Sequence, residues 1–106
     1  MADETAVVEV GDAEFAAAVA QGVVVVDVGA EWCPPCRAMK PVLEDLAQEL
    51  AGQVKVVTVD AEKAAGVARQ LNVQAMPTFL LFRDGVVAGR AVGAMGKRVL
   101  RERLGF

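Results

Sequence analysis

The feature that most constrains the fold of this chain is an apolar run at residues 23–28. Five of its six residues are valine, and the sixth is Asp27. A continuous β-branched run of this length is typical of a central strand that is buried on both faces of a sheet. Helices must then cover both faces, so the run predicts an α/β protein that carries Asp27 into its interior.

The rest of the chain predicts strands and helices that first alternate and then end in a hairpin and a last helix. Further strands are expected at 7–10, 54–59, 78–82 and 86–92, with a hairpin turn at Asp84-Gly85. Helices are expected at 12–20 with Asp12 as the N-cap, at about 34–51 with a kink at Pro41, at 64–71 and at 97–104. This order gives a mixed five-stranded sheet, parallel in its centre and flanked by four helices.

The only two cysteines follow the valine run closely, in the segment Trp32-Cys33-Pro34-Pro35-Cys36. Two thiols separated by two residues can close a small disulfide ring, and such a pair between a strand and a helix indicates a redox centre. We expect Cys33 to be the more exposed thiol and the nucleophile, because the start of a helix favours an anion. Cys36, one turn later and more buried, is expected to resolve the mixed disulfide. Pro34 and Pro35 suit the first helical turn and stiffen the ring.

A structural disulfide and half of a zinc site are the alternatives for the cysteine pair. A four-residue ring would stabilise a fold by only about 2 kcal/mol, against about 3 kcal/mol for a fifteen-residue loop. A zinc site usually takes four ligands, whereas this chain has no histidine and no second cysteine pair. Redox chemistry is therefore the favoured interpretation.

Length and charge limit the classes of function. The 106 residues, 55% of them hydrophobic, fit one domain over residues 1–106. A net charge of −3 disfavours a nucleic-acid partner, which calls for clustered lysine and arginine. The acidic start shows no secretory signal and no apolar run is long enough to span a membrane, so we expect a cytoplasmic protein. That compartment keeps thiols reduced, which favours a catalytic cysteine pair.

The chain resembles the thioredoxin family from about Val7 to Leu104. Four segments carry the resemblance, namely Val26-Asp27-Val28, Trp32-Cys33-Pro34-Pro35-Cys36, Met76-Pro77-Thr78 and Val92-Gly93-Ala94. The resemblance implies a thioredoxin fold and a monomeric reductase of disulfides in client proteins. It also implies that no cofactor is bound, and that a thioredoxin reductase returns the protein to its reduced form with electrons from NADPH. The two-proline active site is a variant, since the most familiar motif has glycine at the position of Pro34.

The resemblance also implies a proton-transfer role for Asp27. Burial disfavours a carboxylate and raises its pKa, so Asp27 could accept and return the proton of Cys36 near neutral pH. A solvent-facing aspartate at a strand end is the alternative. The family often has a lysine beside this carboxylate, and that position corresponds to Val56, while Lys55 falls on the opposite face of its strand. Without that cation the pKa of Asp27 should rise further.

Residues around the cysteine pair are implied to bind clients and to tune the redox potential. Pro77 corresponds to the family's cis-proline and would tune the potential together with Pro34 and Pro35; an ordinary proline at the start of a strand is the alternative. The expected docking residues are Trp32, Met76, Gly93 and Ala94. A single tryptophan is more often a core residue, which is the alternative for Trp32.

One further departure from the family lies directly before the active site. Val28-Gly29 replaces the usual aromatic pair, which removes a second tryptophan and should loosen packing below the active site.

Two other functions compete with the reductase. One is a dithiol oxidant or isomerase of the same fold, which the equilibrium of the cysteine pair with glutathione would separate from a reductase. The other is a binding module that uses the surface around Trp32 irrespective of redox state. The expected cytoplasmic location favours the reductase over the oxidant.

Overall fold

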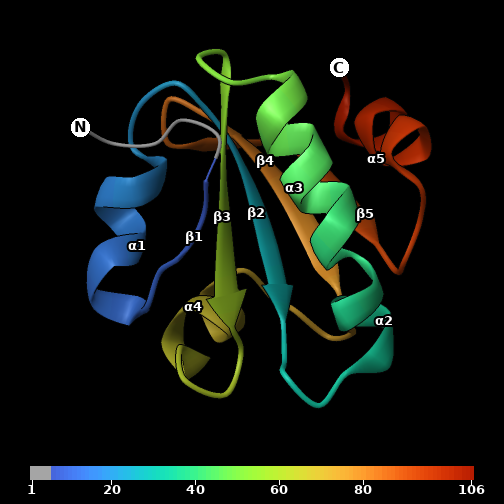
Figure 1. Cartoon of the computed structure of the whole chain (residues 1–106). Coiled ribbons are helices and arrows are strands. Elements are labelled where there is room, and N and C mark those ends of the chain that lie inside the picture. The colour runs from blue at the N-terminus through green and yellow to red at the C-terminus, as the bar shows by residue number, and fades with distance from the viewer. Residues whose placement is uncertain (1–5) are drawn as a thin grey trace.

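A computed structural model describes residues 6–106 and shows a five-stranded sheet between two layers of helices (Figure 1). The strands are β1 (Val7–Glu9), β2 (Val23–Gly29), β3 (Val54–Asp60), β4 (Thr78–Arg83) and β5 (Val86–Val92). The helices are α1 (Asp12–Val19), α2 (Pro34–Ala38), α3 (Lys40–Glu49), α4 (Ala65–Gln70) and α5 (Lys97–Leu104). Most of these bounds agree with the predicted ones to within two residues.

The strand order across the sheet is β1-β3-β2-β4-β5. The three strands β1, β3 and β2 are parallel, whereas β4 runs antiparallel to β2 and β5 runs antiparallel to β4. The predicted fold class is confirmed, with the second of the four expected helices divided into α2 and α3.

The valine run forms β2, the middle strand, and its side chains alternate between two cores. Val24, Val26 and Val28 pack toward α1 and α4, whereas Val25 packs toward α3 and α5. The helices and their ends cover the first face with Phe15, Val19, Val67 and Leu71, and the second with Met39, Leu43, Leu46, Leu50, Leu100 and Leu104. Both faces of β2 are buried, as the run predicts. Each large side chain buried in this way contributes roughly 1.5–3 kcal/mol.

The helix expected at about 34–51 is not continuous. Pro41 has no N–H to bond the carbonyl group four residues earlier, so the regular hydrogen-bond pattern is interrupted. The chain bends before Pro41, at Met39, whose N–H bonds the Cys36 carbonyl (3.1 Å) and whose carbonyl accepts from the Leu43 N–H (2.9 Å). This break separates α2, the short helix that carries the cysteine pair, from α3, which packs on the sheet.

Asp12 is the first residue of α1, and its prediction as the N-cap is wrong. The N-cap is Gly11, whose backbone N–H donates to Glu14 Oε1 at 2.9 Å. The Asp12 carboxylate instead accepts a hydrogen bond from the Val67 N–H at 2.8 Å. Asp12 therefore joins α1 to α4, a tertiary contact that spacing along the chain does not indicate.

The predicted hairpin turn between β4 and β5 is confirmed. Asp84 and Gly85 both have positive φ, 49° and 84°, as the tight turn of a two-residue hairpin requires. Asp84 Oδ1 also accepts a hydrogen bond from the Gly22 N–H at 2.8 Å, which fixes the turn against the loop before β2.

The end of α5 packs tightly against β5 at Gly89. A Cβ atom there would lie only 3.0 Å from the carbonyl carbon of Leu104. We expect Gly89→Ala to lower the free energy of unfolding by about 1–3 kcal/mol, because α5 must move away from the sheet.

Urea denaturation measures this effect against Gly96→Ala, where no heavy atom of the described residues lies within 4 Å of the added Cβ. The control changes a helix N-cap and should cost less than about 1 kcal/mol. Equal unfolding midpoints for the two variants would contradict the tight contact.

Candidate active site

The fold places the cysteine pair where β2 ends and α2 begins (Figure 1). Cys33 is the N-cap of α2, and Pro34 and Pro35 are its first two residues. Cys36 lies one turn further on. The two Cα atoms are 5.2 Å apart and the sulfur atoms form a disulfide. The predicted position of the pair, at the start of a helix directly after a central strand, is confirmed.

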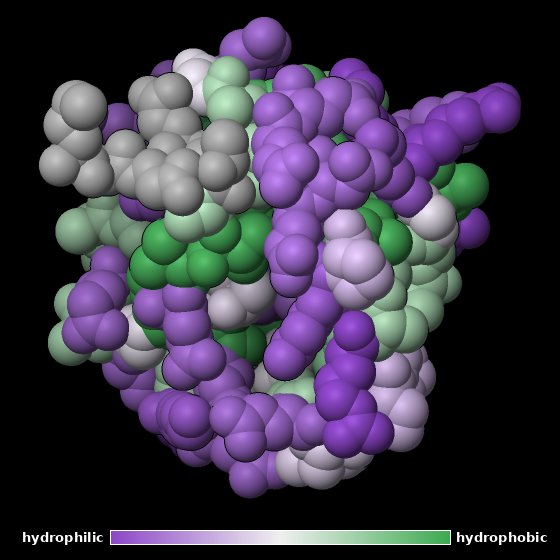
Figure 2. Space-filling model, viewed as in Figure 1, coloured by the Kyte–Doolittle hydropathy of each residue, from purple (hydrophilic) through white to green (hydrophobic). Residues whose placement is uncertain are grey.

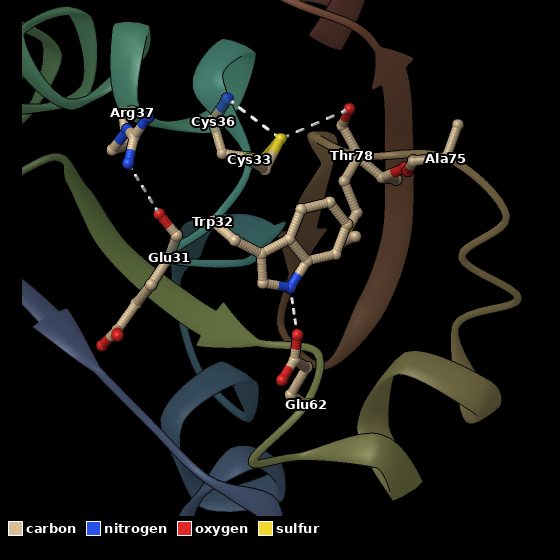
Figure 3. Close-up of a disulfide and its surroundings, with 9 residues drawn as sticks. Glu31, Trp32, Cys33, Cys36, Arg37, Glu62, Ala75 and Thr78 are labelled. Carbon is tan, nitrogen blue, oxygen red and sulfur yellow. Dashed lines mark hydrogen bonds between the residues drawn. A yellow bond between two sulfur atoms is a disulfide. The ribbon is translucent and has the colours of Figure 1, made fainter.

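Cys33 Sγ lies in a polar environment made by the backbone (Figure 3). It accepts a hydrogen bond from the Cys36 N–H at 3.3 Å and lies 4.0 Å from the carbonyl oxygen of Met76. Pro34 and Pro35 have no N–H, so Cys36 supplies the first backbone donor of α2. A donor at the start of a helix stabilises negative charge, which favours a thiolate at Cys33 once the disulfide is reduced.

The expected difference in exposure between the two cysteines is absent. Cys33 is 5% exposed and Cys36 is 7% exposed, so the expectation that Cys33 is the more exposed thiol is wrong for this disulfide form. Both pack with Ala30, and Met76 covers them from the loop before β4. The hydrogen bond from the Cys36 N–H to Cys33 Sγ, and not exposure, distinguishes the two sulfur atoms.

The loop before β4 lies beside the disulfide. The Met76–Pro77 peptide bond in this loop is cis. The Pro77 carbonyl accepts a hydrogen bond from the Gly93 N–H at 2.8 Å, and the Thr78 hydroxyl donates to the Ala75 carbonyl at 2.6 Å. The structure therefore brings Met76 to the cysteine pair and Gly93 to Pro77, and the exposed Ala94 follows Gly93.

Trp32 lies at the surface next to the disulfide (Figure 3). Its side chain is not part of either core, since the residue is 60% exposed. The indole N–H donates a hydrogen bond to the Glu62 carboxylate. Glu62, in the loop after β3, thus orients the tryptophan, a contact that the sequence does not indicate. The alternative of a core tryptophan is excluded.

Asp27 is buried on the face of β2 that α3 and α5 cover. It is 7% exposed, and its Oδ1 atom has no hydrogen-bond partner among the described residues. Burial raises the pKa of this carboxyl group to about 7. The expected direction of the shift is confirmed, and the alternative of a solvent-facing aspartate is excluded.

The residues expected beside Asp27 lie as their positions in β3 predict. Asp27 pairs directly with Thr58, and Val56, two residues earlier on the same face, is buried in the core. Lys55 points to the other face, where its Nζ donates to the Ala18 carbonyl at 3.3 Å. No lysine of β3 therefore neutralises the Asp27 carboxylate.

The backbone at Gly29 packs closely against Cys36, with no room for a side chain. A Cβ atom at Gly29 would lie 3.0 Å from Cys36 Sγ and 3.9 Å from Asp27 Oδ1. All three residues line a cavity of about 130 Å³, together with Lys40 and Thr58. The looser packing expected from Val28-Gly29 is not seen at the contact between Gly29 and Cys36, which is tight.

Two further observations describe residues 6–106 as a whole. None of their helices combines the length and the apolar character needed to cross a membrane. In the same part of the chain, we find no group of three or more His, Cys, Asp or Glu side chains arranged to hold a metal ion.

A cysteine pair that forms a disulfide at a helix N-terminus, with a buried carboxyl group behind it, is the arrangement of a thiol–disulfide oxidoreductase. The comparisons with known proteins give the family. A family model described as Thioredoxin matches residues 6–105. Thioredoxin from Bacillus subtilis (strain 168) is 38% identical over 97 residues, which cover 92% of this chain and 93% of that protein. Thioredoxin from Staphylococcus aureus (strain Mu50 / ATCC 700699) is 37% identical over the same shares.

The chain therefore belongs to the thioredoxin family, and its activity is the reduction of disulfides in proteins.

Proposed function

We propose that the chain reduces client disulfides with Cys33 as the nucleophile and Cys36 as the resolving thiol. This assignment rests on the hydrogen bond that the Cys36 N–H donates to Cys33 Sγ at the N-cap of α2. The Cys33 thiolate attacks one sulfur of the client disulfide, forms a mixed disulfide and releases a client thiolate. Cys36 then attacks Cys33 Sγ, which closes the Cys33–Cys36 disulfide and releases the second client thiol.

Asp27 supports the second step by taking the proton of Cys36, and it returns the proton when the pair is reduced again. A pKa of about 7 lets the carboxyl group both accept and donate a proton near neutral pH. The position of Asp27 supports this role, because Asp27 and Cys36 line the same cavity.

A client segment docks on Trp32, Met76, Gly93 and Ala94. An extended peptide could pair with the backbone at Met76, whose carbonyl oxygen lies 4.0 Å from Cys33 Sγ. Pro34, Pro35 and Pro77 tune the redox potential, the first two as part of the variant two-proline active site. Docking at this surface would place a client disulfide next to the nucleophile.

The reducing equivalents come from NADPH through a thioredoxin reductase, and the chain works as a monomeric, cytoplasmic, single-domain protein. Membership of the thioredoxin family supports a reductase and disulfide-containing proteins as its partners in general. No cofactor is required on the chain itself, since the electrons move through the two thiols.

Insulin reduction with NADPH and a bacterial thioredoxin reductase tests this function. We expect NADPH consumption that depends on the reductase, on insulin and on the chain together. In a control, the chain is first reduced with dithiothreitol, and the dithiothreitol is then removed. This control separates the reduction of insulin by the chain from the reduction of the chain by the reductase. If that reduced chain left the insulin disulfides intact, the reductase function would be overturned; if it reduced them without accepting electrons from the reductase, the proposed electron source would be wrong.

A further inference from the structure

The loop between α4 and β4, residues 72–77, lies beside the cysteine pair and carries part of the proposed docking surface. We call it the docking loop. Its Met76 packs against both cysteines, and the Met76 carbonyl oxygen lies 4.0 Å from Cys33 Sγ. Figure 3 shows Ala75, in this loop, and Thr78, directly after it, close to Cys33. Any contact that holds the docking loop therefore also positions Met76 for a client.

The surface over α3 is less suited to a client than the docking loop. Figure 2 shows the face of the molecule that carries α3, and hydrophilic side chains cover much of this helix. The exposed residues of α3 include Lys40, Glu44, Asp45, Gln48 and Glu49. The buried centre of a protein interface is poor in charged residues, so we expect a client at the docking loop and not over α3.

The segment from β5 to Gly93 holds the docking loop at both ends. At the end next to β4, the Gly93 N–H donates to the Pro77 carbonyl at 2.8 Å. At the end next to α4, the Arg90 guanidinium group donates from Nη1 to the Leu71 carbonyl and from Nη2 to the Asn72 carbonyl, each at 2.8 Å. Because Arg90 and Gly93 are close in sequence, one short stretch of chain fixes both ends of the loop.

The two carbonyl groups that Arg90 binds lie where α4 ends and the docking loop begins. Leu71 is the C-cap of α4, and the last carbonyl groups of a helix have no partner within it. A positive charge at this end also interacts favourably with the helix dipole. Asn72 has a φ of 55°, a left-handed conformation in which the chain leaves the helix direction. The planar guanidinium group can bind both carbonyl groups at once, whereas the ammonium group of lysine is a single point of charge.

An arginine on an edge strand often serves only to prevent pairing with another sheet, and β5 is an edge strand. Two observations distinguish Arg90 from this case. Its partner across β4 is Leu80, which belongs to the core under α1 and α4, so Arg90 lies on the α4 face of the sheet. Its side chain also binds the backbone of a segment 18 and 19 residues earlier in the chain.

We propose that Arg90 is a positioning residue for client docking, whose guanidinium group fixes the end of α4 and thereby keeps Met76 in place for a client disulfide. The inference rests on the proposed docking of clients at Met76. Without the two hydrogen bonds, the docking loop would populate other conformations. The apparent affinity for a client falls by the fraction of molecules that keep the docking conformation, whereas the chemistry of the cysteine pair is unchanged.

Arg90→Met tests this role, because it removes the guanidinium group and retains an unbranched apolar side chain. Arg83→Met is the matched control, since Arg83 is exposed at the end of β4 farthest from Thr78. Each chain is reduced in advance and mixed with excess insulin or excess bis(2-hydroxyethyl) disulfide, which is too small to contact the docking surface. Acid quenching, alkylation of the remaining thiols and mass spectrometry then give the second-order rate constant of each reaction.

We expect Arg90→Met to lower the rate constant with insulin about tenfold, which corresponds to about 1.4 kcal/mol. The rate constant with the small disulfide should not fall, and Arg83→Met should leave both rate constants unchanged. Arg90→Lys should retain more of the insulin reaction than Arg90→Met, because it keeps the charge. Circular dichroism verifies that each variant is folded. A merely structural role of Arg90 would lower both reactions equally, and that result would overturn the proposal.

Hydrogen exchange with mass spectrometry tests the docking loop itself. The amides of residues 73–76 should exchange faster in Arg90→Met than in the wild-type protein, and at the wild-type rate in Arg83→Met. Unchanged exchange in Arg90→Met would overturn the proposal, and so would faster exchange with an unchanged insulin reaction. If the wild-type chain left insulin intact, the reductase function would fail instead, and the exchange rates would still decide whether Arg90 holds the loop.

Discussion

Replacing Cys33 with serine is expected to lower the rate of insulin disulfide reduction by about a thousandfold or more. The serine hydroxyl keeps the shape of the N-cap but is a far weaker nucleophile than a thiolate at neutral pH. The Cys36 N–H would then donate to an alcohol oxygen in place of a sulfur that carries negative charge. Steady-state turnover with NADPH and a thioredoxin reductase measures the loss.

A control variant separates the loss of the Cys33 thiol from an effect on the stability of α2. Ala38→Ser, on the exposed side of α2, introduces the same side chain without removing a thiol and should retain turnover. Near-normal turnover by Cys33→Ser would contradict the assignment of Cys33 as the nucleophile. An equal loss in Ala38→Ser would instead attribute the effect to the stability of α2.

Asp27→Asn is expected to stabilise the protein at pH 8 by up to about 4 kcal/mol, which is the free energy of a shift of about three pKa units. Burial raises the pKa of Asp27 from 3.8 to about 7, so the folded protein holds this proton more tightly than the unfolded chain. Well below pH 3.8 the carboxyl group is protonated in both states and its ionisation costs no stability. As the pH rises from 4 to 7, the unfolded chain releases the proton first, and the wild-type protein loses stability.

Urea unfolding at pH 4 and at pH 8 measures this difference. The stabilisation by Asp27→Asn should be present at pH 8 and small at pH 4, because the amide does not ionise. Glu44→Gln, which removes an exposed carboxyl group of α3, is the control and should show no comparable pH dependence. A stabilisation of the same size at both pH values would show that packing, and not ionisation, accounts for it.

The sequence predicts the framework of this fold because each of its signals is local. The valine run specifies a strand covered on both faces, and Asp84-Gly85 specifies a tight hairpin turn. The position of Cys33 at the start of α2 follows from the two prolines after it. The burial of Asp27 follows from its place in the same run.

Other parts of the site depend on contacts between distant segments, which spacing does not reveal. Met76 comes from the loop before β4 and buries Cys33 as deeply as Cys36, so the expected difference in exposure is absent. Glu62 reaches Trp32 from the end of β3. Gly29 is visible in the sequence as a departure from the family, but only the fold shows that its backbone packs against Cys36 and lines a cavity with Asp27.

The most direct test of the central claim identifies the sulfur atom that first bonds to a client. Reduced Cys36→Ser is mixed with insulin, quenched with acid after a single turnover and mapped by mass spectrometry, with Cys33→Ser treated in parallel. We predict a stable mixed disulfide between insulin and Cys33 in the first variant, and little adduct in the second. An adduct that accumulates on Cys36 of Cys33→Ser, with none on Cys33 of Cys36→Ser, would contradict the account.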